Sequence, residues 1–273
     1  MNARNGASVI RVLGLSFVLY LVWCLATWFF EGRVNLLQQP TPIGRAVYVI
    51  IANILVGIVG VAWLLRSPLA HGFTDLDKLG FRSPRRSLVA IILALIGGFA
   101  LFIVQGPPSL EPLVVWNGFA QVLPGSVAEI LVCWVAVGAL TEAATKGRGR
   151  LVSLALAILA ADVLFGLYHF AHSAPFNQWP IVLFLMVVGL LTSLVYFLTR
   201  DVYATILVHN FMGMKGVMGS IDLAILRQPL IPLYLLVVLS VVVLVLVHLW
   251  LHQQAVKDGE ISRKPTMRMR PVT

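Results

Sequence analysis

Six titratable or amide side chains lie inside long apolar stretches of the sequence, where they could do chemistry: Glu129, Asp162, His169, His172, His209 and Asn210. Burial in an apolar setting makes a carboxylate a stronger base, which suits it to activate a water molecule. One histidine can share that task, and a second can donate a hydrogen bond to a developing oxyanion. Such a group could hydrolyse an amide bond inside a membrane. Histidines and a carboxylate could instead hold a zinc ion.

Spacing along the expected helices places three of these groups at similar depth. We predict that one helix begins at Pro124, because proline is favoured in a first helical turn, and Glu129 then lies about 7–8 Å into it. The next helix runs the opposite way and should break near Pro175, with His169 about 9 Å before that point. His209 falls near the middle of a later apolar run. We therefore expect three helices to bring these side chains into one cavity.

A purely structural role is the main competing interpretation for each of these residues. Buried polar side chains often hydrogen-bond across membrane helices and hold them together. For one such residue alone, this interpretation is the better one. Three chemically complementary groups at one depth favour a functional site.

The composition indicates that membrane helices must position these groups. Hydrophobic residues make up 59% of the 273 residues, charged residues make up 11%, and the mean hydropathy is +0.93. A soluble domain averages about 45–50% apolar and about 25% charged residues. The values exclude a soluble enzyme, a disordered chain, a coiled coil and a disulfide scaffold. Because spanning segments must be helices or closed barrels, and the apolar runs have helical length, we predict an all-α polytopic integral membrane protein.

Eight apolar runs are long enough to cross a bilayer, at about 20 residues each. They cover approximately 12–30, 46–65, 87–105, 124–141, 151–172, 180–199, 202–219 and 230–251. We expect a single transmembrane bundle over 1–251. The polar, basic segment 252–273 should form a mobile cytoplasmic tail.

The basic residues indicate an orientation. The net charge is +9, and membrane proteins gather such charge in cytoplasmic loops, so no nucleic-acid partner is implied. With eight spans, 16 of the 20 Lys and Arg residues fall on the side that holds both termini, and 4 fall on the other. We predict that both termini are cytoplasmic, with membrane lipids as partners and a bacterial plasma membrane as the location.

Other hydrolase patterns are absent from the sequence. There is no His-Glu-x-x-His for a metalloprotease helix, no Gly-x-Ser-x-Gly nucleophile turn and no Walker loop. The two cysteines, Cys24 and Cys133, both lie in apolar runs, which argues against a disulfide or a cysteine-rich zinc site.

Several segments resemble the CPBP family of intramembrane proteases, which includes CAAX proteases and bacteriocin-processing, Abi-like proteins. The segment Phe165–His169 fits the family's Phe-x-x-x-His pattern, and Ala204–His209 resembles the approach to its His-x-x-x-Asn or Asp pattern. The segment Leu79–Arg82 is also similar. The resemblance is best over roughly 120–219, which we expect to be the core of the bundle.

The chain departs from the family's patterns at three positions. If Glu129 matches the second glutamate of Glu-Glu-x-x-x-Arg, then Ala128 and Cys133 replace the first glutamate and the arginine. A shift by one residue makes Glu129 the first glutamate, and the sequence leaves both registers open. Gly213 stands where asparagine or aspartate is expected after His209.

The resemblance implies an intramembrane endopeptidase that cleaves a membrane-associated protein or peptide. Glu129 would activate water with help from His169, and His209 would stabilise the oxyanion with support from Asn210. Asp162 and His172 are further supporting candidates. We expect no cofactor; if zinc is present, Glu129, His169 and His209 would be its ligands.

Two other functions remain open at this stage. A degenerate family member could keep the fold and act as a non-cleaving binding or immunity protein, which Ala128, Cys133 and Gly213 motivate. A small transporter subunit is the third hypothesis, with Asp162 and the histidines as a proton path. The predicted orientation places the site in the extracytoplasmic half, whereas a prenylated CAAX substrate would need access from the cytoplasm, so the substrate stays open.

Overall fold

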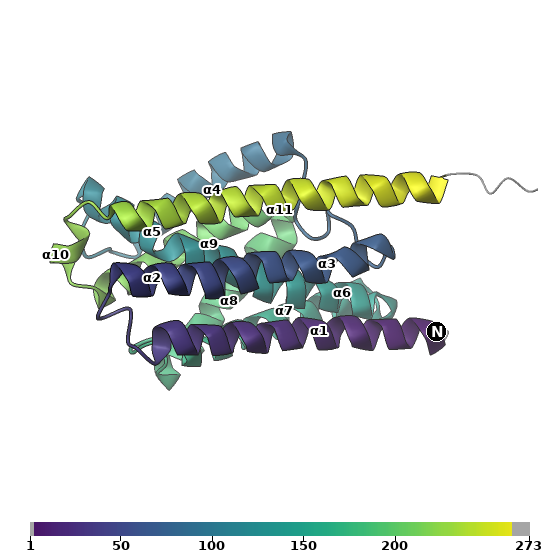
Figure 1. Cartoon of the computed structure of the whole chain (residues 1–273), viewed down its shortest axis with the longest axis horizontal. Coiled ribbons are helices and arrows are strands. Elements are labelled where there is room, and N and C mark those ends of the chain that lie inside the picture. Colours follow the sequence, from purple (N-terminus) through teal and green to yellow (C-terminus); the bar gives the residue numbers. More distant parts are fainter. Residues whose placement is uncertain (1–2, 264–273) are drawn as a thin grey trace, which may run out of the picture.

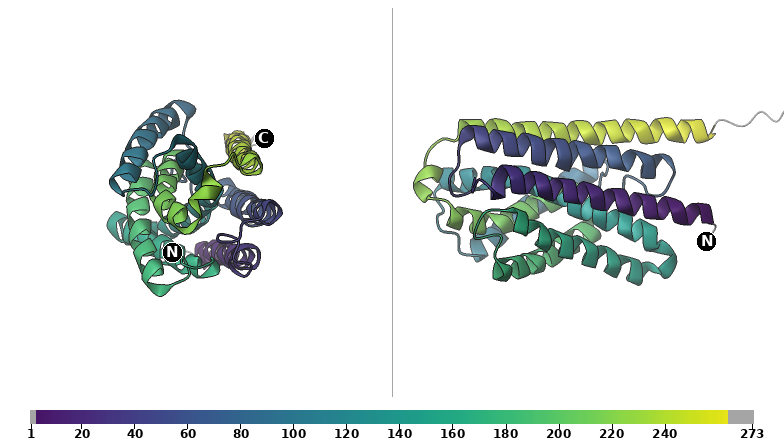
Figure 2. Two further views of the ribbon diagram at one scale, coloured as in Figure 1. Left: turned by 90° about the vertical axis from the view of Figure 1, so that its left-hand side faces the viewer. Right: turned by 60° about the horizontal axis from the view of Figure 1, so that its bottom comes forward.

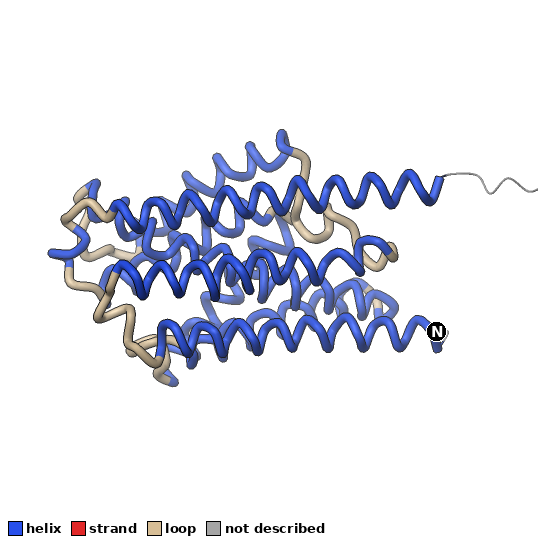
Figure 3. Tube along the Cα trace, in the orientation of Figure 1, coloured by secondary structure: helices blue, strands red, loops and turns tan. Residues whose placement is uncertain are grey.

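The computed structural model describes residues 3–263 as a bundle of helices. The long helices lie roughly side by side along one axis and are joined by loops at the two ends (Figures 1 and 3). Within the described residues there is no strand. The all-α class predicted from the apolar runs is confirmed.

Residues 3–263 form eight helical rods, several of them with π-helical or short 3-10 segments. In chain order these are α1 (Ala3–Thr27) with η1 (Trp28–Gly32); α2 (Pro42–Tyr48), η2 (Val49–Gly60) and α3 (Val61–Ala70); α4 (Pro84–Val104); α5 (Pro112–Glu129), η3 (Ile130–Ala139), α6 (Leu140–Thr145) and η4 (Lys146–Arg148); α7 (Arg150–Tyr168) with η5 (His169–Ala171); α8 (Trp179–Thr199); α9 (Val202–Ser220); and α11 (Ile231–Arg263). The short α10 (Leu223–Leu226) lies between α9 and α11.

Seven helices among the described residues are long and apolar enough to cross a membrane. The eighth rod, α9, is less apolar because it carries His209, Asn210 and Lys215. It packs against α4, α5 and α8, and its nineteen residues extend about 28 Å. His209 and Asn210 are therefore buried between helices, whereas Lys215 is exposed near the end of α9.

The outer surface of the bundle is apolar, as a bilayer requires. Val104 is 83% exposed and Leu198 is 80% exposed, although both are large hydrophobic residues. Large apolar patches on a soluble surface would promote association. The chain is an integral membrane protein.

The central rod is the continuous helix from α5 through η3 to α6. All ten residues of η3 are buried. We expected this span to begin at Pro124, but α5 begins at Pro112, and Pro124 lies inside the helix. Membrane helices tolerate an internal proline where neighbouring groups compensate for the missing hydrogen bond. Glu129 consequently lies deeper in a helix than the sequence indicated.

A tight turn sets the start of α9. Arg200 adopts a left-handed conformation with φ 51°, which ends α8. Asp201 then caps α9, and its side chain accepts a hydrogen bond of 2.9 Å from the backbone N–H of Ala204. The other carboxylate oxygen accepts one of 2.6 Å from Ser87 on α4. These contacts fix the start of α9 relative to α8 and α4. They therefore also fix the position of His209 along α9.

The last helix is longer than predicted. We expected the final span to end at 251, but α11 continues to Arg263. Part of the expected tail 252–273 is therefore helical, and residues 264–273 lie outside the described part of the chain.

The two ends of the bundle differ in what they hold. The start of α1, the end of α3 and the start of α7 lie at one end, and α10 lies at the other with the α1–α2 connection (Figures 1 and 2). We call the second end the α10 end. The cavity that holds the predicted site reaches the α10 end.

Candidate active site

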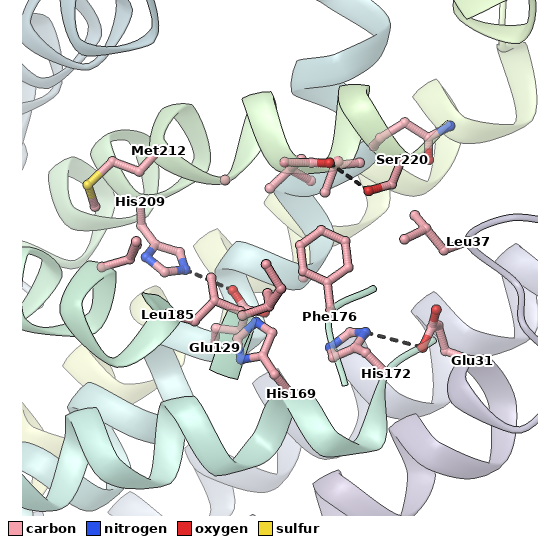
Figure 4. Close-up of a pocket in the computed structure, with 18 of the residues that line it drawn as sticks. Glu31, Leu37, Glu129, His169, His172, Phe176, Leu185, His209, Met212 and Ser220 are labelled. Atoms are coloured by element: carbon pink, nitrogen blue, oxygen red, sulfur yellow. Dashed lines mark hydrogen bonds and ion pairs between the residues drawn. The ribbon is translucent and has the colours of Figure 1, made fainter. Parts of the chain in front are cut away.

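A cavity of about 530 Å³ lies between the helices and contains most of the predicted site residues. Glu129, His169, His172 and His209 all line it (Figure 4). Most of the remaining lining is apolar, as in Leu185 and Phe176. Its volume is in the range of about 300–1,000 Å³ that is common for ligand sites, and apolar walls with a few convergent polar groups are typical of such sites.

Glu129 and His209 form the central contact of the cavity. The Nε2 atom of His209 lies 2.8 Å from the Oε2 atom of Glu129, and both side chains are buried. The other ring nitrogen of His209, Nδ1, lies 2.8 Å from the hydroxyl of Thr192 on α8. Both nitrogens of His209 are therefore engaged, and its ring holds the carboxylate in place.

His169 is oriented by its own helix. Its Nδ1 atom lies 2.8 Å from the carbonyl oxygen of Phe165, one turn earlier, so Nδ1 carries the hydrogen. The Nε2 atom of a neutral ring is then a free acceptor. The Phe165 ring meets the rings of His169 and His209 edge-on, at 4.7 Å and 5.1 Å between centroids. Phe165 thus spaces and orients two histidines at once, which gives the Phe-x-x-x-His pattern a physical meaning.

His172 belongs to the same cavity but is held from a different helix. Its Nδ1 atom lies 3.2 Å from the carboxylate of Glu31, which comes from η1 at the end of the first rod. Glu31 also accepts a 2.8 Å hydrogen bond from the backbone N–H of Ser173 and one from the Ser173 hydroxyl. Burial disfavours the charged form of His172, but Glu31 opposes this effect and raises the pKa of His172 above its ordinary value.

Three groups are close enough to share one small ligand. A ligating atom from each of Glu129, His169 and His172 lies within 4.8 Å of the other two. A water molecule about 2.8 Å from each of three atoms fits such a spacing up to its upper limit. Zinc at about 2.0–2.1 Å needs ligand atoms closer together, and one carboxylate with two histidines is a donor set that it accepts. The group that could hold a metal thus includes His172, whereas we expected His209 in that place.

Two of the supporting candidates point elsewhere. Asn210 donates to the carbonyl oxygen of Phe119 at 3.3 Å and accepts from Ser126 at 3.3 Å, and it does not line the cavity. Asp162 accepts a 2.5 Å hydrogen bond from Ser193, which in turn accepts one from Trp134. These contacts join helices, so the structural interpretation describes both residues.

The structure also decides which face of the central helix carries the acid. Ala128 packs against η2, where a Cβ atom added to Gly57 would lie 2.6 Å from the Ala128 methyl group. Glu129 alone of the two faces the histidines. Cys133 is fully buried in the core, and Gly213 lines the cavity. The acid of this site is therefore Glu129, whichever register relates it to the family pattern.

Sequence reasoning missed Glu31 and Thr192. Glu31 follows three aromatic residues and lies directly after the predicted first span, 12–30. Its spacing held a signal, since Trp23, Thr27 and Glu31 follow one another at intervals of four and lie on one helical face. Thr192 gave no signal, because threonine is common in membrane helices.

Comparison with known proteins identifies part of the chain. Residues 109–214 match the family described as type II CAAX prenyl endopeptidase Rce1-like. This region runs from just before α5 into α9 and includes Glu129, His169, His172 and His209. No curated protein and no solved structure was found to match the chain.

Proposed function

We propose that the chain is an intramembrane endopeptidase of the CAAX protease (CPBP) family that acts through Glu129. The match of residues 109–214 to the Rce1-like family supports this proposal. The observation that carries this proposal is the 2.8 Å contact between Glu129 and His209 inside an apolar cavity that His169 also lines. A buried carboxylate held in this way is suited to take a proton from water.

In the proposed reaction, water lies between the Glu129 carboxylate and the Nε2 atom of His169. Its oxygen bonds to the carbonyl carbon of the substrate amide, its proton passes to Glu129, and the carbonyl electron pair moves onto the oxygen. The C–N bond then breaks as the carbonyl re-forms, and the leaving nitrogen takes the proton from Glu129. The net change consumes one amide and one water and gives one acid and one amine.

His209 has a different role in this proposal from the one the sequence suggested. We expected it to stabilise the oxyanion, but its two ring nitrogens are engaged by Glu129 and Thr192. It orients Glu129. It also shares the proton that Glu129 takes from water, until this proton passes to the leaving nitrogen. A zinc ion held by Glu129, His169 and His172 would instead supply a Lewis acid. We propose the metal-free reaction, because Glu129 and His169 can activate water without a metal while His209 orients Glu129.

The substrate should reach the cavity from the membrane. Phe184 on α8 lines the cavity and is also 61% exposed on the outer surface of the bundle. The apolar lining suits an apolar segment of a protein or peptide. A peptide embedded in the bilayer is therefore the substrate class that the site favours.

Replacement of Glu129 by glutamine tests the proposal. The purified protein is placed in liposomes with two internally quenched probes, an apolar membrane peptide and a prenylated peptide that ends in a CAAX sequence. We expect cleavage of at least one probe by the wild type and a fall of at least about 10³-fold in Glu129→Gln, because the base is lost. The control is Glu111→Gln, which removes an equally charged side chain that is exposed and paired with Arg227.

Two results would contradict the proposal. Unchanged cleavage in a well-folded Glu129→Gln protein would remove Glu129 from the mechanism. If the wild type cleaves neither probe, the non-cleaving interpretation becomes the better one, and the departures at Ala128, Cys133 and Gly213 would then explain it.

A further inference from the structure

One fully buried ring nitrogen beside the cavity has no hydrogen-bond partner among the described residues. The Nε2 atom of His172 is buried and makes no hydrogen bond to any of the described residues. A buried polar atom without a partner carries a free-energy cost, so its presence calls for an explanation. Figure 4 shows this nitrogen on the side of the ring that faces His169 and Glu129, opposite the contact with Glu31.

Glu31 fixes how His172 presents that nitrogen. The Glu31 carboxylate contacts Nδ1 of His172 at 3.2 Å and receives two further hydrogen bonds from Ser173. A carboxylate on Nδ1 favours the protonated ring, in which both nitrogens carry a hydrogen. One N–H then points to Glu31, and the other points toward His169 and Glu129.

The first helical rod supplies this support. Trp23, Thr27 and Glu31 lie on one face, and all three are buried. Trp23 stacks on Tyr168 at 3.7 Å between ring centroids, and Thr27 lies 3.3 Å from the Tyr168 hydroxyl. The Tyr168 ring in turn meets the His172 ring edge-on at 4.7 Å. The first rod therefore supports His172 directly through Glu31 and indirectly through Tyr168. This rod lies outside the matched residues 109–214.

We propose that His172 is a further catalytic residue, which donates its Nε2–H to the oxyanion of the substrate, and that Glu31 is its positioning residue. This inference rests on the proposed endopeptidase function. A ligating nitrogen of His172 and a carboxylate oxygen of Glu129 lie within 4.8 Å of each other, so one substrate carbonyl can lie between the water on Glu129 and the donor on His172. His209 cannot take this role without giving up a contact with Glu129 or Thr192.

The chemistry adds no new reactant to the proposed hydrolysis. As the water oxygen bonds to the carbonyl carbon, negative charge develops on the carbonyl oxygen, and the N–H of His172 stabilises it. When the C–N bond breaks, the electron pair returns to the carbonyl, and His172 keeps its proton. His172 therefore lowers the barrier without accepting or losing an atom.

A matched pair of variants at position 172 tests the donor. Phenylalanine keeps a ring of similar size against Tyr168 but has no N–H, whereas glutamine keeps an N–H donor at similar reach. With the quenched probe that the wild type cleaves, we expect His172→Phe to lower kcat about 10²–10³-fold with KM little changed. His172→Gln should retain most of that activity. Thermal unfolding in detergent confirms that both proteins are folded.

A second variant tests the positioning role. Glu31→Gln keeps hydrogen-bonding atoms but removes the charge, so we expect kcat to fall about tenfold with KM little changed. Because Glu31 acts through His172, the same substitution should have no further effect on kcat in the His172→Phe background. Equal effects in both backgrounds would show that Glu31 only supports the fold.

The outcomes separate this inference from the proposed function. If Glu129→Gln abolishes cleavage while His172→Phe cleaves at the wild-type rate, the endopeptidase stands and the role of His172 is wrong. If His172→Gln is as inactive as His172→Phe, the donor is not what matters. Inhibition by 1,10-phenanthroline that added Zn²⁺ reverses would also overturn the inference, because Nε2 would then bind a metal and not an oxyanion.

Discussion

The hydrogen bonds of single nitrogen atoms distinguish the three histidines of the site. His209 uses both ring nitrogens, His169 uses only Nδ1, and His172 uses Nδ1 on a carboxylate and leaves Nε2 free. In the proposed reaction, His209 accordingly orients the base, His169 accepts a hydrogen bond from water, and His172 donates one to the oxyanion. Residue type and spacing alone could not assign these roles.

The Glu31–His172 pair also predicts a pH dependence of stability. His172 lies outside the spans; burial disfavours its charge, but Glu31 and Glu129 act in the opposite direction, so its pKa is raised. Such a group stabilises the fold fully below its ordinary pKa of about 6.5, and this stabilisation is lost as pH rises through the raised value. We expect the melting temperature of the wild type to fall more than that of Glu31→Gln between about pH 6 and about pH 9.

The control for this measurement is Glu111→Gln. The hydrogen bond from Arg227 keeps the pKa of Glu111 below its ordinary value, so this pair does not titrate in the same interval. Its melting curve should follow the wild type over the whole range. If Glu31→Gln also follows the wild type, then His172 is not charged in the folded protein.

At the scale of single elements, much of the site was predictable from the sequence. Helical geometry and antiparallel order predicted that Glu129, His169 and His209 share one cavity, and all three line it. The predicted depth of Glu129 was wrong, because its helix begins at Pro112 and not at Pro124. Asn210 follows His209 directly and therefore points about 100° away from it, toward Phe119. Glu31 and His172 are 141 positions apart in the sequence, and no local pattern contains such a contact.

The close approach of the first rod to η5 is a second element-scale feature. A Cβ atom at Gly32 would overlap the carbonyl oxygen of Ala171, so only glycine allows the rod to lie this close to the segment that carries His172. We expect Gly32→Ala to destabilise the protein by about 1–3 kcal/mol and to lower cleavage, because Glu31 and His172 would separate. Thermal unfolding in detergent and the cleavage assay measure both effects.

Gly14 provides the matched control on the same rod. An added Cβ atom there would have no atom within 4 Å, so Gly14→Ala should leave stability and cleavage unchanged or slightly improve stability. Equal melting temperatures for Gly32→Ala and the wild type would mean that the rod can move away from η5 without cost.

On the scale of the whole molecule, the cavity extends toward one end of the bundle. Its lining reaches Leu37, Gln105 and Ser220, which lie at or near loops of the α10 end. Among the described residues, 13 of the 17 basic residues lie toward the opposite end, where α1 begins and α11 ends. Since basic residues favour the cytoplasm, the cavity should open toward the extracytoplasmic side. A substrate would then present its cleavage site on that side, which fits a membrane peptide better than a cytoplasmic CAAX protein.

Cysteine labelling in intact cells tests this orientation. Ser220 lies at the mouth of the cavity, and Ser83 is exposed at the other end, just before α4. We expect a membrane-impermeant maleimide to label Ser220→Cys in intact cells and to label Ser83→Cys only after the membrane is permeabilised. The wild type measures the background from Cys24 and Cys133, which both lie within spans. The reverse pattern would open the cavity to the cytoplasm, and a prenylated CAAX protein would then become the substrate that the site can reach.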